Sequence, residues 1–406
     1  MRVAFIVTSY WAFGELLIAI QFAEELKNLQ NRVLFIIPPT HKKNVEAKGF
    51  KYVTWIPKSR KFNQIILAEV EHSFCPEVVI LSDFLNYSFA DKHYGILRED
   101  LDIFGGKLAT FDIYNWSLER KCMDTYGFVS PIPNKVDIKD YGAKILPCPL
   151  INPENKENEL GYRYSVVHKL LDTSQKNKEE LRKKYGFHVN EKIILVSYAK
   201  WQESHIQNEK VGHFIDFSGR LFDELIIQLS FYYTIICIGK ETEGFRDYSN
   251  IHCYDSMPAK QFDEYAMTAD LYIGKNMTST SMIRLALSEI MCVNIINSIV
   301  FPHKIEEKSF GNFNYAAELE DIHMYKYMML PVGWYEFLKP VFQNNPYADI
   351  VCMREQFKMN ETMEVIHELL FNEQERARIT ERVAALKCSL EKLKSPIQIV
   401  NHIINE

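Results

Sequence analysis

Hydroxyl and amide side chains gather in one stretch of the sequence, GKNMTSTSMIRLALSEIM, which runs from Gly274 to Met291. The apolar run ADLYI precedes the stretch and CVNIINS follows it, which predicts a strand-to-helix junction. The first turn of a helix leaves up to about four N–H groups unpaired and carries roughly +0.5 charge, which suits a phosphate. One such residue is enough to cap a helix, so the run favours phosphate binding over capping alone. The residues concerned are Asn276, Thr278, Ser279, Thr280 and Ser281.

Two aspartates stand at the ends of apolar runs nearer the start of the chain. Asp83 ends the run EVVILSD, and Asp112 ends the run KLATFD. Ligands of open parallel sheets bind beyond the carboxyl ends of the strands, so either side chain could orient a catalytic base or bind an acceptor. Aspartate is also an ordinary turn residue at a strand end, and this alternative stays open for both.

The elements that must position these residues alternate between strand and helix. The run VAFIVT (3–8) is typical of a strand buried on both faces, and ELLIAIQFAEELKNL after it has helical spacing. The alternation pauses at the polar stretch NPENKEN (152–158) and resumes at KIILVSY (192–198). It predicts an α/β protein with two doubly wound Rossmann-like domains.

The length of 406 residues allows two hydrophobic cores. We place the first domain, which we expect to bind the acceptor, at residues 1–172 and the second, which we expect to bind the donor, at residues 173–395. Pro396 is expected to open a last helix, 396–406, that returns to the first domain. The aromatic-rich segment 301–351 has weak periodicity and is expected to elaborate the second domain.

Composition narrows the class of protein. The formal net charge of −6 argues against a broad nucleic-acid surface, and no run reaches the ~18–20 apolar residues of a membrane span. The start, MRVAFIVTSYW, lacks a signal-peptide cleavage site, and the eight cysteines have no zinc-site spacing. We expect a cytoplasmic protein with reduced thiols, no membrane span and no nucleic-acid partner; its oligomeric state stays open.

A resemblance to a known family rests on the order of the two domains and on two segments. These are the junction MPAKQFDEYAMTADLYIGKNMTSTSMIRLALSEIMCVNII and the tail HELLFNEQERARITERVAAL, which resemble GT-B fold glycosyltransferases. Such enzymes carry two Rossmann-like domains facing across a cleft and move a sugar from a nucleotide diphosphate to an acceptor. Their junction often reads H-G-G-x-x-T-x-x-E-A-L-x-x-G-x-P. Aligned without gaps, this chain has Asn276 at the His, Met277 and Thr278 at the glycines, Ser281 at the Thr, Arg284 at the Glu and Glu289 at the last Gly.

The departure at Arg284 matters because the family's glutamate commonly holds the nucleotide ribose. A guanidinium there can pair with phosphate instead, or it can belong to a solvated helix face. Thr280 and Ser281 keep their implied place at the diphosphate, since the N–H groups of the first turn do not depend on side-chain identity.

The stretch FGELLIAIQFAEEL near the start resembles the family's G-G-H-x-x-P-x-x-x-x-A-x-x-L loop and first helix. Gly14 fits the glycine, and Glu15 occupies the position of the histidine base of inverting relatives. A carboxylate there can accept a proton if burial raises its pKa; alternatively it is a helix-start acid favoured by the dipole. Tyr10, Trp11 and Phe13 are expected to form an aromatic wall against the acceptor. The alternative is that they pack between the domains.

The loop VSYAKWQES follows the first strand of the second domain, where GT-B enzymes approach the diphosphate and the sugar. Lys200 could neutralise the departing diphosphate, or it is a solvated surface lysine. The candidates for donor binding in this loop and two others are Ser197, Lys200, Trp201, Gln202, Gly239, Lys240, Met257 and Pro258.

Together these features predict an inverting glycosyltransferase whose co-substrate is a nucleotide sugar, with a UDP-sugar favoured. We expect a small-molecule, peptide or nucleoside acceptor, and Glu15, Asp112 and Asp83 as catalytic residues. No other cofactor is expected, and the site is expected to be metal-independent, because the only D-x-D triplet (100–102) precedes a predicted strand. Two alternatives stay open: a nucleotide-sugar epimerase or hydrolase of the same fold, and a binding protein without catalysis.

Overall fold

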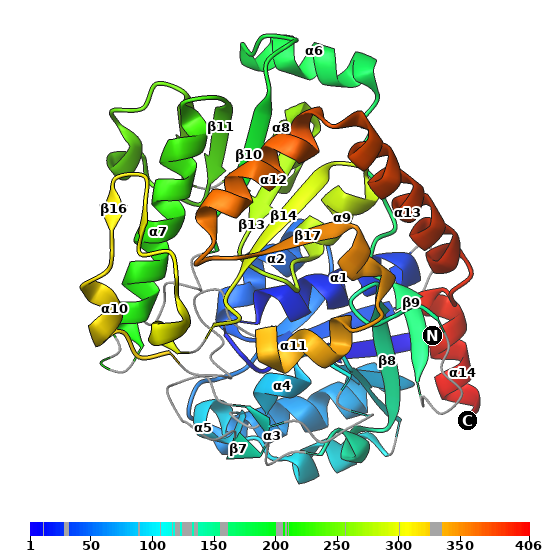
Figure 1. Ribbon diagram of the computed structural model, residues 1–406. Coiled ribbons are helices and arrows are strands. Elements are labelled where there is room, and N and C mark those ends of the chain that lie inside the picture. The colour runs from blue at the N-terminus through cyan, green and yellow to red at the C-terminus, as the bar shows by residue number, and fades with distance from the viewer. Residues whose placement is uncertain are drawn as a thin grey trace. The chain divides into compact units, whose positions relative to one another are not determined.

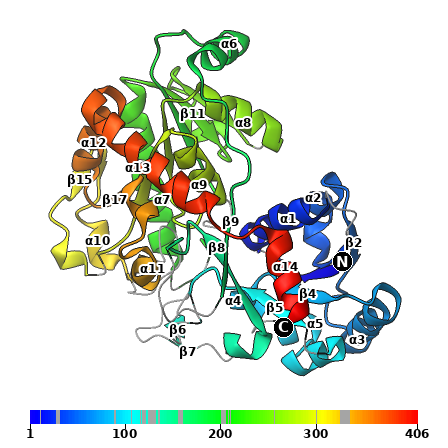
Figure 2. The same ribbon diagram turned by 90° about the vertical axis from the view of Figure 1, so that its right-hand side faces the viewer.

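The computed structural model describes most of the chain as two compact units. Unit 1 comprises Met1–Cys122, Pro133–His168 and Cys388–Glu406, and unit 2 comprises Met123–Ile132 and Lys169–Lys387. Each unit is a parallel sheet with helices, so the predicted α/β class with two doubly wound domains is confirmed (Figure 1 and Figure 2). The described residues are 1–10, 12–27, 32–87, 90–105, 107–115, 117, 122–123, 132–133, 137–154, 161–199, 206–207, 209, 211–255, 257–299, 301–324 and 335–406.

Unit 1 is built on a seven-stranded sheet in the order β3-β2-β1-β4-β5-β8-β9. Its described pairings are parallel, and Ala4 of β1 faces Leu34 on one side and Val79 on the other. The strand order therefore reverses beside β1. The strands are β1 (Arg2–Ile6), β2 (Arg32–Ile37), β3 (Lys51–Thr54), β4 (Val78–Leu81), β5 (Leu108–Phe111), β8 (Ala143–Cys148) and β9 (Tyr162–Ser165).

The core of unit 1 lies between this sheet and helix α1 (Phe13–Lys27). Phe22 of α1 is fully buried, and its ring centroid lies 6.1 Å from that of Phe5, 5.5 Å from that of Phe111 and 5.0 Å from that of Tyr164. These edge-on contacts join three strands to one helix, and such aromatic pairs contribute beyond their buried area.

The last helix of the chain, α14 (Pro396–Asn405), packs on α1 and β4 within unit 1. The Ser395 side chain accepts a hydrogen bond from the N–H of Gln398, and the Gln398 side chain accepts one from the N–H of Ser395. Pro396 occupies the first helical position. The other helical segments of the unit are η1 (Pro39–His41), α2 (Lys42–Ala47), α3 (Arg60–Glu69), η2 (Val70–Phe74), α4 (Phe84–Tyr87), α5 (Ala90–Tyr94), η3 (Arg98–Phe104) and η4 (Ile138–Tyr141). Two short strands, β6 (Cys122–Met123) and β7 (Ile132–Pro133), form a separate two-stranded sheet.

Unit 2 is built on a six-stranded sheet in the order β12-β11-β10-β13-β14-β17, with parallel described pairings. Leu195 of β10 faces Ile236 and Tyr272, so the order reverses beside β10. The strands are β10 (Ile193–Ser197), β11 (Thr234–Ile238), β12 (Ile251–Tyr254), β13 (Leu271–Gly274), β14 (Met291–Ile296) and β17 (Val351–Glu355).

Helices cover both faces of this second sheet, as right-handed crossovers require. The helix α7 (Gly212–Ser230) packs on β11 and on α12 (Met359–Phe371), whereas α8 (Ala259–Thr268) packs on β10 and α9 (Thr280–Leu287) packs on β13 and β14. Between β14 and β17 the chain forms an elaboration. Its elements are η7 (Pro302–Lys304), β15 (Ser309–Phe310), β16 (Phe313–Asn314), α10 (Glu318–Asp321), α11 (Tyr335–Phe342) and η8 (Pro346–Asp349). The remaining helical segments of the unit are α6 (Gln175–Tyr185), η6 (Thr242–Phe245) and α13 (Glu373–Glu391).

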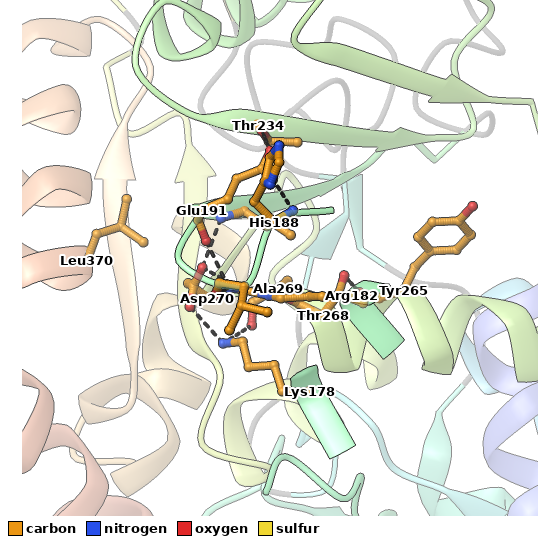
Figure 3. Close-up of polar contacts among 12 residues, drawn as sticks. Lys178, Arg182, His188, Glu191, Thr234, Tyr265, Thr268, Ala269, Asp270 and Leu370 are labelled. Carbon is orange, nitrogen blue, oxygen red and sulfur yellow. Dashed lines mark hydrogen bonds and ion pairs between the residues drawn. The ribbon is translucent and has the colours of Figure 1, made fainter. Parts of the chain in front are cut away.

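A buried ion pair fastens α6 to the segment where β13 begins (Figure 3). Arg182 donates to Asp270 Oδ2 at 2.8 Å and, through its Nε, to the carbonyl of Thr268 at 3.0 Å. The backbone N–H of Ile193, where β10 begins, donates to the same Asp270 oxygen at 2.9 Å. Because the carboxylate has several donors, it can stay charged while buried.

No helix in the described part of the chain is long and apolar enough to cross a membrane. Free thiols are found at Cys75, Cys148, Cys237, Cys253, Cys292, Cys352 and Cys388.

Truncating the central ring of unit 1 is expected to destabilise it strongly. Phe22→Ala leaves a cavity among three aromatic rings, which should lower the free energy of unfolding by about 3–5 kcal/mol. Phe62→Ala is the matched control, because Phe62 lies in the same unit and is 59% exposed. Urea denaturation followed by circular dichroism measures both; equal losses in the two variants would contradict this account of the core.

Candidate functional site

The two strand-order reversals are where the structure gathers candidate functional groups. In unit 1 the reversal lies between β1 and β4, and in unit 2 it lies between β10 and β13. The loops that follow two such strands leave toward opposite faces of the sheet, which opens a crevice at their carboxyl ends.

Asp83 lies at the reversal of unit 1, two residues after β4, and is fully buried. Its Oδ2 accepts hydrogen bonds from the backbone N–H groups of Thr8 at 2.8 Å and Ser9 at 2.6 Å, and from the Thr8 hydroxyl at 3.1 Å. Its Oδ1 is buried too, but no described residue bonds to it. One oxygen therefore ties the loop after β1 to the end of β4, and the other is left for a proton or a ligand.

At this reversal the negative charge of Glu15 disfavours ionisation of Asp83. The pKa of Asp83 is raised to about 8, chiefly by burial and also by the nearby Glu15 carboxylate, against the lowering effect of the Thr8 and Ser9 donors. Burial also raises the pKa of Glu15, although a backbone N–H at the start of α1 lowers it. Neighbouring carboxyl groups in such surroundings favour a state in which one of them keeps a proton.

His41 supports the same loop and was not anticipated from the sequence. Its buried Nε2 lies 3.0 Å from the carbonyl oxygen of Ser9, which can only accept, so Nε2 carries the proton. Burial lowers the pKa of His41 to about 4, so the ring is neutral near pH 7. Within the described residues, nothing bonds to its Nδ1.

Two further contacts fix the loop from which α1 begins. The indole N–H of Trp55 donates to the carbonyl of Val7 at 2.8 Å, and the Thr40 hydroxyl donates to the carbonyl of Tyr10 at 3.3 Å. The backbone before Glu15 is therefore hydrogen-bonded by the side chains of Asp83, Trp55 and Thr40. Such preorganisation is what a catalytic carboxylate requires.

The predicted acceptor residues lie on the surface beside this loop. The rings of Tyr10 and Phe13 are each 44% exposed; Tyr10 meets the ring of His93 edge-on at 5.4 Å, and Phe13 meets that of His41 at 4.6 Å. Gly14 has open space where a Cβ would stand. Trp11 lies outside the described residues.

Asp112 follows β5, one strand away from Asp83, and is also buried. Its Oδ2 accepts from the backbone N–H of Ser117 at 2.9 Å and from the Ser117 hydroxyl at 2.6 Å. This local arrangement matches the turn alternative raised for an aspartate at a strand end.

At the reversal of unit 2, a lysine that the sequence analysis overlooked lies directly after β13. Lys275 is 4% exposed, and its Nζ lies 4.7 Å from the ring centroid of Phe222 and 5.5 Å from that of Tyr198. Aromatic faces stabilise a cation that has been taken out of water. Its signal was its position between Gly274 and Asn276, the first charged residue after an apolar strand.

The predicted hydroxyl cluster follows Lys275 and begins α9. Ser279 is the N-cap, its Oγ accepting from the N–H of Met282 at 3.2 Å, and Asn276 Oδ1 accepts from the N–H of Thr278 at 3.1 Å. Capping therefore explains these residues in part. The backbone N–H groups and hydroxyls of Thr280 and Ser281 have no hydrogen-bond partner among the described residues. They remain available as donors.

Ser197 and Tyr272 connect the two strands at this reversal. The Ser197 hydroxyl at the end of β10 hydrogen-bonds the hydroxyl of the buried Tyr272 on β13. Burial raises the pKa of Tyr272 to about 12, so its hydroxyl keeps its proton. Ser197 is thus held at the carboxyl end of β10.

Arg284 is held by an acid of its own unit. Its guanidinium makes two parallel bonds to Asp263 of α8, at 2.9 and 2.7 Å, and its Nε donates to the carbonyl of Lys169 at 3.1 Å. A phosphate at Arg284 would have to compete with this fork-shaped pair. Glu289, aligned with the family's last glycine, has a φ of +67°, the left-handed conformation that glycine favours after a helix.

The remaining donor candidates lie after β11 and before α8. Gly239 has a φ of +89°, and a Cβ there would lie 2.3 Å from the carbonyl oxygen of Tyr198, so only glycine fits. Lys240 forms an ion pair with Asp223 at 2.8 Å. Met257 is half-buried, and the exposed Pro258 precedes the first turn of α8. Lys200, Trp201 and Gln202 lie outside the described residues.

Among the residues that the structure describes, no three His, Cys, Asp or Glu side chains gather as a metal site would require.

Comparison with known proteins agrees on the fold. A model of a family of unknown function, DUF6365, matches residues 22–406, and no curated protein matches the chain. The solved structure of the spinosyn forosaminyltransferase SpnP is similar over 100% of both chains, at 13% identity and a TM-score of 0.56. The glycosyltransferase SnogD from Streptomyces nogalater is similar over 100% of this chain and 99% of its own, at 11% identity and a TM-score of 0.52. The predicted GT-B fold is confirmed; at such identities the likeness concerns the fold alone.

The buried carboxyl of Asp83 is expected to make stability depend on pH. Its pKa is about 8 in the folded chain against an ordinary value of 3.8, so its contribution is complete below about pH 3.8 and is lost as the pH rises through about 8. Asp83→Asn cannot titrate but keeps an oxygen for Thr8 and Ser9. The free energy of unfolding of the wild type, relative to that of the variant, should therefore fall between about pH 4 and pH 8.

Denaturant titrations across this pH range test the expectation, with the exposed Asp91→Asn as the control in the same unit. A difference between the wild type and Asp83→Asn that stays constant with pH would contradict the protonated state of Asp83.

Proposed function

Because the chain belongs to DUF6365, a family of unknown function, and has the GT-B fold, we propose that it is a glycosyltransferase that moves a sugar from a nucleotide diphosphate to an acceptor. One observation carries the proposal: both strand-order reversals hold polar groups that lack partners within the described chain. In unit 1 this group is Asp83 Oδ1, and in unit 2 these groups are the amides that begin α9. Fold alone does not fix a reaction, so the chemistry of these groups has to support it.

Unit 2 suits the donor's diphosphate. The N–H groups of Thr280 and Ser281 and their hydroxyls are four donors at the positive end of a helix. The segment that leads into this helix begins with Lys275, whose ammonium packs on the ring of Phe222. When a glycosidic bond to a nucleotide diphosphate breaks, negative charge develops on the leaving phosphate. Fixed donors and a desolvated cation stabilise such charge without reorganisation. A UDP-sugar remains the donor to be tested first.

Unit 1 suits the activation of an acceptor. In the proposed step the Glu15 carboxylate takes the proton of an acceptor hydroxyl or amine, whose freed lone pair attacks the anomeric carbon as the bond to the diphosphate breaks. Direct displacement inverts that carbon, and no step requires a metal. In this proposal Asp83 keeps the proton and Glu15 carries the single charge of the two neighbouring acids, since the pKa of Asp83 is raised to about 8.

Removing the proposed base should abolish most of the activity. Glu15→Gln keeps the size of the side chain but cannot accept a proton, so we expect the rate to fall about 10²–10⁴-fold. Release of UDP from UDP-sugars, measured with a panel of acceptors, provides the assay. Glu24→Gln on the same helix is the control, since Glu24 forms an ion pair with the exposed Lys48; an unchanged rate in Glu15→Gln would remove Glu15 from the mechanism.

Removing the cation of unit 2 should weaken donor binding. Lys275→Met keeps the apolar stem against Phe222 but loses the charge, so we expect the Kd for UDP to rise at least about tenfold. Calorimetry compares it with Lys260→Met, which removes an exposed lysine from α8. Equal affinities for UDP in the wild type and Lys275→Met would exclude this lysine from the site.

The same assays separate the two alternatives. Conversion or hydrolysis of the nucleotide sugar without any acceptor would indicate an epimerase or a hydrolase. Binding of UDP with no turnover across acceptors would indicate a binding protein, which the loss of the family's glutamate at Arg284 would then explain.

A further inference from the structure

A cavity of about 230 Å³ lies at the opposite end of the sheet of unit 2, where β13 and β14 begin. The residues that line it include Lys178 of α6, Asp270 before β13, Glu289 before β14, and Arg376 and Thr380 of α13. Because β13 runs from Asp270 toward Lys275, the cavity and the proposed donor site lie at opposite ends of the same strand. Neither the family nor the proposed function assigns this cavity a role.

One carboxylate in this cavity, that of Asp270, forms ion pairs with two cations. Lys178 Nζ lies 2.7 Å from Asp270 Oδ1, and Arg182 lies 2.8 Å from Asp270 Oδ2 (Figure 3). Although burial raises the pKa of Asp270, Lys178 and Arg182 hold it below its ordinary value, so the carboxylate is charged. Because Asp270 carries one negative charge, it neutralises only one of the two positive charges of Lys178 and Arg182.

Arg376 brings a third cation to the same place. Its guanidinium makes one long contact, 3.5 Å to the carbonyl oxygen of Leu370, and no carboxylate of the described chain pairs with it. Arg378, two residues along the same helix, is paired with Glu375. Burial lowers the pKa of Lys178, and the charges of Arg182 and Arg376 lower it further, which places Arg376 within electrostatic reach of the ammonium.

The other acid of the cavity does not cancel this excess. Glu289 forms its own ion pair, with its Oε1 lying 2.8 Å from Nζ of Lys387. The cations of the cluster thus outnumber its two carboxylates. A buried or half-buried cation without a partner is costly, and an anion that pairs with it removes the cost.

We propose that this cavity binds a small phosphate-class oxyanion between Lys178 and Arg376. A guanidinium fork and an ammonium are the side chains that proteins use for phosphate oxygens. The Thr380 hydroxyl, which no described residue engages, provides a further donor. A water occupies about 30 Å³, so the cavity has room for a phosphate group with part of its hydration shell or with a small organic substituent.

Calorimetric titration of the full-length protein with inorganic phosphate tests the proposal. The wild type should bind phosphate, Arg376→Gln should bind it at least about tenfold more weakly, and Arg378→Gln should bind it as the wild type does. Thermal denaturation verifies that each variant is folded. No binding by the wild type, or equal binding by the wild type and Arg376→Gln, would overturn the proposal.

Two further titrations identify the site and the form of the ligand. Lys275→Met should bind phosphate as the wild type does; loss of phosphate binding in this variant alone would place the anion at the proposed donor site and overturn the assignment to the cavity. Failure of UDP to bind the wild type would affect only the proposed function. Glycerol 3-phosphate binding through Arg376 more tightly than inorganic phosphate would show a phosphomonoester site, and equal affinity would show recognition of the phosphate group itself.

Discussion

The reversal of strand order beside the first strand of each parallel sheet is the constraint on which the rest of the structure depends. Beside β1 and beside β10, consecutive loops leave for opposite faces, so packed helices cannot cover the carboxyl ends of both neighbouring strands. Polar groups at these two places must find partners in the loops or in a ligand. Asp83 does the first with one carboxyl oxygen and leaves the other unpaired.

The two units place groups of opposite charge at these reversals. Unit 1 buries carboxyl groups, and burial with mutual repulsion raises the pKa of Asp83 so that the pair can keep a proton. Unit 2 buries an ammonium against aromatic faces and adds the unpaired amides that begin α9. A sugar transfer needs a proton acceptor for the nucleophile and positive charge for the leaving phosphate, and each unit offers one of the two.

Much of the fold was predictable because the β-branched runs and helical spacing persist through both units. The position of Asp83 was predictable too, since a strand end is visible in the sequence, whereas its bonds to Thr8 and Ser9 depend on which strand lies beside β4. The same reason hid the Arg284–Asp263 pair, which joins two helices through tertiary packing. Lys275 and His41 were missed because a single charged or titratable residue in a loop carries no periodic signal; only the fold shows that both are buried.

A crystal structure of the protein with bound UDP tests the central claim most directly. The account predicts diphosphate oxygens within hydrogen-bond distance of the backbone N–H groups of Thr280 and Ser281, with the ammonium of Lys275 beside them. A nucleotide whose diphosphate lies away from the start of α9, or a protein that takes up no nucleotide from solution, would contradict it.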